Sequence, residues 1–198
     1  MKYLFFDLET RKLASDLHKD NEKGWELLRQ GKGGISVLAI WDSKEKWCFL
    51  YDDNHLEEIA AHLESSDVLV GWNSIGFDLP VVEGMLGRKL VLKEHIDLYA
   101  LTKQALDKAH QRGRKGEYRL GSVCERTFGE KKLESGEMVT ELIRKGLWAR
   151  LFRYCANDVR LTRNLFNHVV VEGGIISING TFLPLELPKY LMESRCPQ

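Results

Sequence analysis

Acidic side chains occur in three short motifs that are spread along the chain. Asp7 and Glu9 stand two residues apart in an apolar run near the start, Asp78 lies further along, and Asp158 follows Tyr154 by four residues. Carboxylate oxygens are the ligands that hard divalent cations prefer, and a pair of such cations assists hydrolysis. The motifs therefore favour metal-assisted hydrolysis, with a phosphodiester as the most suitable substrate.

Each motif also has a simpler explanation. Alternation along a strand places Asp7 and Glu9 on one face, but both are merely solvated if they lie beyond the buried part of the strand. Asp78 is also suited to capping a helix. Tyr154 and Asp158 lie on one side of a helix, where a buried tyrosine beside a surface acid is common. The joint occurrence of the motifs, in this order, favours a shared metal site.

The three motifs together resemble those of the DEDD superfamily of 3′–5′ exonucleases. That superfamily has the ribonuclease H-like fold and includes the proofreading domains of polymerases and ribonuclease D. The matching segments are residues 6–10, 73–78 and 154–158. The residue five positions before the last acid is Arg153 and not histidine, whereas Tyr154 is present. The chain is therefore similar to the tyrosine branch of the superfamily.

The resemblance implies two Mg²⁺ or Mn²⁺ ions per active site. Asp7 would bridge both ions, and Glu9 and Asp158 would complete the first ion's ligand set. Asp78 would support the second ion, and the Tyr154 hydroxyl would orient the attacking water. The implied reaction releases nucleoside 5′-monophosphates from single-stranded nucleic acid, either DNA or RNA. Two alternatives stay open: a nucleic-acid-binding module of this fold without catalysis, and a ribonuclease H-like endonuclease.

Other residues are candidates for contact with the substrate or the site. Asn73 is a candidate for binding a phosphate or the strand end, although a turn residue that satisfies local backbone groups is an equal explanation. A glycine-flanked basic loop supplies Arg112, Arg114 and Lys115 as candidates for backbone phosphates, although most such clusters are only solvated. Asp97 is either a supporting acid or, as we favour, the cap of the following helix.

The elements that must position these residues follow from the pattern of apolar side chains. Residues 2–8 predict a central strand buried on both faces. A hairpin over 35–51 precedes further strands at 67–72 and near 95–97. Helices are predicted over 55–64, 78–86, 98–106, 120–128, 136–145 and 148–171. This order predicts an α/β, ribonuclease H-like fold whose mixed five-stranded sheet has helices on both faces.

The length of 198 residues suits one well-buried domain. We therefore expect a single exonuclease-like domain over residues 1–198. Residues 11–33 are polar and bounded by glycines, which predicts an inserted loop with a short helix around 25–28. Residues 174–184 predict a hairpin in which Asn-Gly supplies the turn.

The composition is ordinary for a soluble globular protein. The chain has 29 basic and 29 acidic residues, so bulk charge does not indicate a strongly basic nucleic-acid binder. Clustered acids at a metal site can nevertheless offset a local basic surface. The apolar residues 3–6 are too few for a secretion signal or a membrane span. Four cysteines without a CxxC pair predict reduced thiols in a cytoplasmic protein: Cys48, Cys124, Cys155 and Cys196.

Overall fold

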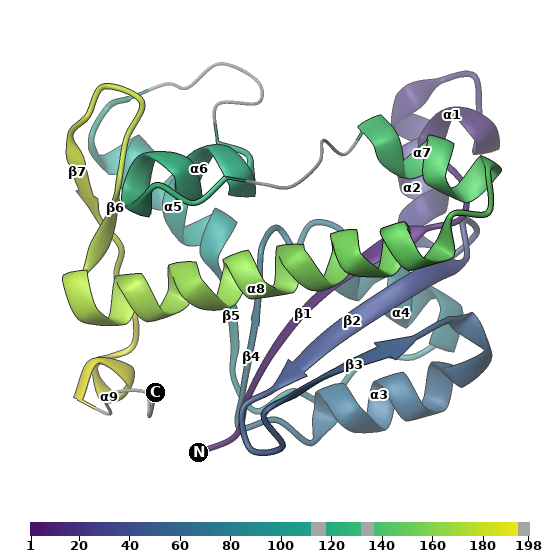
Figure 1. Ribbon diagram of the computed structural model, residues 1–198, viewed down its shortest axis with the longest axis horizontal. Helices are drawn as coiled ribbons and strands as arrows, with labels where there is room; N and C mark the ends of the chain where they lie inside the picture. The colour runs from purple at the N-terminus through teal and green to yellow at the C-terminus, as the bar shows by residue number, and fades with distance from the viewer. Residues whose placement is uncertain (112–117, 132–136, 194–198) are drawn as a thin grey trace.

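A five-stranded sheet forms the centre of the computed structural model, which describes residues 1–111, 118–131 and 137–193. The strand order is β3-β2-β1-β4-β5 (Figure 1). The middle strand β1 pairs antiparallel with β2 and parallel with β4. The predicted mixed sheet with a central first strand is therefore confirmed. The strands are β1 (Tyr3–Thr10), β2 (Ile35–Asp42), β3 (Trp47–Tyr51), β4 (Val68–Gly71) and β5 (His95–Asp97).

The long helix α8 (Trp148–Glu172) crosses one face of the sheet, over β1 and β2. Phe5 of β1 points to this face and meets Phe166 of α8 edge-to-face, with ring centroids 5.5 Å apart. Three further helices add apolar residues to the same cluster: α5 (Leu98–Lys108), α6 (Leu120–Phe128) and α7 (Glu137–Arg144). No helix in the described part of the chain combines the length and apolar character needed to span a membrane.

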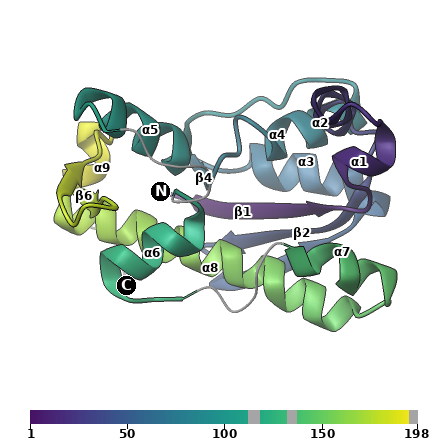
Figure 2. The ribbon, with the colours of Figure 1, turned by 90° about the horizontal axis from the view of Figure 1, so that it is seen from above.

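The opposite face is covered by α3 (Leu56–Glu64) and α4 (Asp78–Leu86). Figure 2 shows these two helices on one side of β1 and α8 on the other. Phe6, the neighbour of Phe5, packs into this second cluster and is also fully buried. Because successive side chains of a strand point to opposite faces, the run of aromatic residues supplies both cores at once. This confirms the prediction of helices on both faces.

The segment between β1 and β2 differs in detail from its prediction. Between β1 and β2 the chain forms two helices, α1 (Ala14–Leu17) and α2 (Asn21–Arg29), where the sequence predicted one short helix. The helices pack so closely that a Cβ atom on Gly24 would lie 2.1 Å from the Ala14 carbonyl oxygen. The four residues of α1 are too few to show a helical period, so this contact was hidden in the sequence.

The C-terminal region contains the predicted hairpin, made by β6 (Gly174–Ile176) and β7 (Phe182–Pro184). Asn179 and Gly180 lie in the turn that joins the strands, and Gly180 adopts a positive φ of 75°. A short helix, α9 (Lys189–Glu193), follows the hairpin and was not predicted. The 3₁₀ turn η1 (Asp53–His55) precedes α3. The described cysteines Cys48, Cys124 and Cys155 form no disulfide.

A buried carboxylate at the end of β2 links the sheet to α3. Asp42 accepts from Lys2 at 2.9 Å and lies 3.1 Å from Nε2 of His62. Burial by itself would raise the pKa of Asp42, but hydrogen bonds from Lys2, His62 and two turn amides outweigh it and lower the pKa to about 2. Ionised Asp42 therefore stabilises the fold above pH 3.8, and this stabilisation is lost as pH falls toward 2.

We expect Asp42→Asn to lower the free energy of unfolding at pH 7 by about 2 kcal/mol, since one pKa unit corresponds to about 1.4 kcal/mol. The difference between wild type and variant should shrink as pH falls from 4 to 2, because the wild-type carboxylate is then protonated. Urea unfolding at a series of pH values measures both effects. A difference that stays constant across this range would contradict the assignment.

Candidate metal centre

Strand β1 carries Asp7 and Glu9 to the face that α8 covers. Phe6 and Leu8, which alternate with them, pack into the core on the other face. Strand β4 pairs with β1 only as far as Phe5, so the acids lie beyond the point where these two parallel strands separate. Such an opening at the carboxyl ends of parallel strands is where α/β proteins usually assemble their sites.

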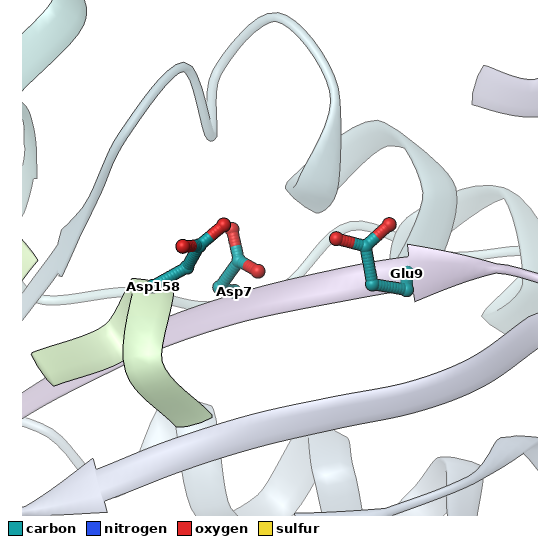
Figure 3. A group of neighbouring side chains, drawn as sticks. All are labelled: Asp7, Glu9 and Asp158. Carbon is teal, nitrogen blue, oxygen red and sulfur yellow. The ribbon is translucent and has the colours of Figure 1, made fainter. Parts of the chain in front are cut away.

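Helix α8 brings Asp158 to these two acids. One carboxylate oxygen from each of Asp7, Glu9 and Asp158 lies within 4.8 Å of the other two. Figure 3 shows Asp7 and Asp158 next to each other and Glu9 further along β1, with all three side chains pointing to the same side. Asp158 is buried and the other two are half-buried. The structure thus brings together three of the four acids predicted from the sequence.

The donor set of this cluster fits Mg²⁺ or Mn²⁺. All three ligands are carboxylate oxygens, which suit hard cations, whereas zinc sites in proteins usually include histidine or cysteine. Adjacent carboxylates repel one another, and the repulsion grows where protein replaces water. A divalent cation offsets this cost, so the cluster is suited to bind one.

Tyr154 precedes Asp158 by one helical turn, and its hydroxyl makes a hydrogen bond with the Asp158 carboxylate. Burial raises the pKa of Tyr154 well above its ordinary value, and the charges of Asp158, Glu9 and Asp7 add to the rise. The phenol therefore stays protonated at neutral pH. Tyr154 is therefore a hydrogen-bond donor at the edge of the cluster.

Asp78, the fourth predicted acid, lies outside the group of three. It is the first residue of α4, and Phe77 occupies the cap position, so the side chain of Asp78 does not cap this helix. Its Oδ1 atom instead accepts the backbone N–H of Leu8 at 3.0 Å, between Asp7 and Glu9 in the chain. Burial raises the pKa of Asp78 to about 7 despite this hydrogen bond, and the charges of Asp97 and Asp158 add to the rise.

Cys155 contacts the site although sequence reasoning identified it only as a thiol. Its Sγ atom lies 3.2 Å from the Asp7 carbonyl oxygen and 3.6 Å from Oδ2 of Asp7. Burial raises the pKa of the thiol well above its ordinary value, with the charges of Asp7, Glu9 and Asp158 adding to the rise. A neutral thiol on α8 thus donates to Asp7. Its position next to Tyr154 was the available signal, but the contact depends on how α8 crosses β1.

The other residues predicted to contact the substrate or the site do not belong to the group of three acids. Asn73 is exposed in the turn after β4 with a φ of 61°, and its N–H donates to Oδ1 of Asp97 at 2.9 Å. This contact involves the backbone of Asn73, so the role of its side chain in substrate binding stays a prediction. Asp97 caps α5 as favoured from the sequence, accepting from the first-turn amides of that helix. The basic residues Arg112, Arg114 and Lys115 lie outside the described residues.

Comparison with known proteins identifies the fold. The sequence matches no family of known proteins and no curated protein. Among solved structures, the fold is similar to that of the family B DNA polymerase from the hyperthermophilic archaeon Pyrobaculum calidifontis, with a TM-score of 0.62 and 20% identity over 86% of this chain. The chain spans 24% of that polymerase's length. The α/β architecture is ribonuclease H-like, which confirms the predicted fold class and gives the chain a nuclease-like fold.

We expect the wild-type protein to bind Mn²⁺ and Asp158→Asn to weaken that binding by more than tenfold. The reason is that loss of an outer-shell partner alone typically costs about 10–100-fold in metal affinity, and Asp158 is a direct ligand candidate. Isothermal titration with Mn²⁺ measures the affinity. Glu57→Gln is the matched control, because this acid is 82% exposed on α3 and should leave the affinity unchanged. Equal affinity in Asp158→Asn and wild type would rule out the centre.

Proposed function

We propose that this chain is a metal-dependent 3′–5′ exonuclease of the tyrosine branch of the DEDD superfamily. It hydrolyses phosphodiester bonds of single-stranded DNA or RNA and releases nucleoside 5′-monophosphates. The observation that carries the proposal is the meeting of Asp7, Glu9 and Asp158 at one point of a ribonuclease H-like sheet. The similarity in fold to a DNA polymerase supports the proposal, because proofreading domains of polymerases belong to the superfamily that the motifs resemble.

The three clustered acids would hold Mg²⁺ or Mn²⁺, with Asp7 shared between two ions. Two such ions, when bound, stabilise both the attacking and the leaving oxygen of an in-line displacement. Asp78 would support the second ion from its place behind β1, where its carboxylate fixes the backbone between Asp7 and Glu9. Ionisation of Asp78 is favoured once a cation is near, because opposite charge lowers the pKa of a carboxyl group.

Tyr154 would orient the attacking water through its hydroxyl. This role suits a phenol that burial keeps protonated, and its hydrogen bond to Asp158 fixes the hydroxyl beside the cluster. The neutral thiol of Cys155, the next residue of α8, would hold Asp7 by donating to its backbone oxygen. Two donors of α8 would then restrain Asp7 and Asp158 before substrate arrives, which is the preorganisation that electrostatic catalysis needs.

Substrate contacts are proposed for exposed polar and basic residues. Asn73 lies at the turn that leads to Asp78 and would contact a phosphate or the strand end. Arg112, Arg114 and Lys115 would contact backbone phosphates by charge attraction. We further propose that residues 1–198 act as one exonuclease-like domain in the cytoplasm, which the unpaired thiols of the described cysteines support.

We expect the protein to shorten single strands from the 3′ end in Mg²⁺ or Mn²⁺ and to release 5′-monophosphates. Asp7→Ala should abolish turnover, since Asp7 is the shared ligand. Tyr154→Phe should be milder, because it removes one hydroxyl that donates a hydrogen bond; an oriented donor in a transition state is worth about 3–4 kcal/mol at most. Gel electrophoresis of 5′-labelled DNA and RNA of one sequence measures the shortening, and chromatography of the released nucleotides identifies them as 5′-monophosphates.

Two controls make the assay decisive. Asp7→Ala should keep the wild-type melting temperature in the absence of metal or exceed it, because it removes one of several repelling charges. Activity that persists in excess EDTA, or in Asp7→Ala, would refute a metal-dependent nuclease. Internal cleavage of the labelled strand would favour a ribonuclease H-like endonuclease. Tight binding of metal and nucleic acid without cleavage would favour the inactive binding module.

A further inference from the structure

Asp97, at the end of β5, accepts more hydrogen bonds than a helix cap requires. Its Oδ1 atom accepts the N–H groups of Tyr99 and Ala100 at 2.9 and 3.2 Å, which caps α5. The same atom accepts the N–H of Asn73 at 2.9 Å, and Oδ2 accepts the N–H of Ile75 at 2.9 Å. The last two donors belong to the loop between β4 and α4. The buried carboxylate therefore joins β5 to that loop.

The loop has an unusual backbone that needs such support. Asn73 adopts a positive φ of 61°, a conformation that residues other than glycine rarely take. The Oγ atom of Ser74 lies 2.9 Å from Nε2 of His95, so β5 holds the loop a second time. A Cβ atom on Gly71 would lie 2.3 Å from the Ser74 Oγ atom, which shows how closely the loop returns to the end of β4.

Hydrogen bonds continue from this loop to the metal centre. The N–H of Leu79 donates to the Ser74 carbonyl oxygen at 2.9 Å, which attaches the first turn of α4 to the loop. Asp78 precedes Leu79, and its Oδ1 atom accepts the Leu8 N–H at 3.0 Å. Leu8 stands between the two acids of β1. A path of short contacts thus runs from Asp97 through the loop and Asp78 to the strand that carries Asp7 and Glu9.

We propose that Asp97 is a positioning residue for the candidate metal centre. By holding the N–H groups of Asn73 and Ile75, it fixes the loop so that Asp78 meets β1 between Asp7 and Glu9. The expected effect of Asp97 on the rate rests on the proposed nuclease function. The path of hydrogen bonds from Asp97 to Leu8 does not depend on that function. Displacement of a catalytic group by about 1 Å can lower a rate by about 100-fold, so a distant support matters.

The substitution Asp97→Ser separates the two roles of the Asp97 side chain, which are to cap α5 and to hold the loop between β4 and α4. Serine is among the best helix caps, so Asp97→Ser keeps an acceptor for the α5 amides. Its side chain is shorter and has one oxygen, so it cannot also reach Ile75. Asp97→Asn keeps one acceptor oxygen and loses the other, and should be intermediate. Asp20→Ser is the matched control, because Asp20 caps α2 through the N–H groups of Glu22 and Lys23 and accepts no loop amide.

Amide hydrogen exchange of the metal-free proteins, followed by NMR at pH 7, tests the link without any activity. In Asp97→Ser, the Ile75 and Leu8 amides should exchange about tenfold faster or more, while the α5 amides keep their protection. Asp97→Asn should show a smaller acceleration, and it provides the same readout if the serine variant does not fold. Unchanged exchange of Leu8 and Ile75 in both variants, as in Asp20→Ser, would overturn the proposal.

Steady-state kinetics test whether the path from Asp97 to Leu8 affects the rate of the proposed reaction. For Asp97→Ser we expect kcat to fall by about 100-fold with little change in KM, and Asp97→Asn to restore part of the rate. Asp20→Ser should keep the wild-type kcat. Wild-type protein without activity would refute the proposed function, while accelerated exchange of Leu8 in Asp97→Ser would still support the link. An active wild type with undiminished kcat in both Asp97 variants would refute the positioning role.

Discussion

Repulsion among carboxylates at the crossing of β1 and α8 is the constraint on which the arrangement of this protein depends. Asp7, Glu9 and Asp158 are held with oxygens within 4.8 Å of one another, and Asp158 is buried. Their mutual repulsion is opposed by the rest of the fold, which packs α8 against β1 with large apolar contacts such as that between Phe5 and Phe166. Core packing thus stabilises an arrangement that the acids alone would disfavour, as expected for a site that binds cations.

The separation of β1 from β4 creates the space for this arrangement. The pairing of β1 with β4 ends at Phe5, and the backbone N–H of Leu8, which lies beyond this point, needs an acceptor. Asp78 supplies it from the start of α4. The carboxylate that accepts the Leu8 N–H therefore also lies near the acids of the candidate metal centre. A single side chain satisfies the backbone and contributes to the electrostatics of the site.

The parts that sequence reasoning predicted are those encoded locally. Two-sided apolar character identified β1 as the central strand, and the spacing of Tyr154 and Asp158 placed both on one side of a long helix. Contacts between distant segments were not predictable in this way. The cap at Asp97 was expected from its local sequence, but its bonds to Asn73 and Ile75 depend on the parallel pairing of β4 with β5. Cys155 was expected only to be a reduced thiol, and its contact with Asp7 exists because α8 crosses β1.

The crossing of α8 over β1 also has a consequence for synthesis of the protein. The residues that meet there, such as Asp7 and Cys155, are 148 positions apart in the chain. Ribosomes add about 5–20 residues per second, so the acids of the first strand are made many seconds before their partner on the helix. A nascent or truncated chain that ends before α8 lacks Asp158 and cannot assemble the cluster. Assembly of the acidic cluster is thereby restricted to chains whose synthesis has passed α8.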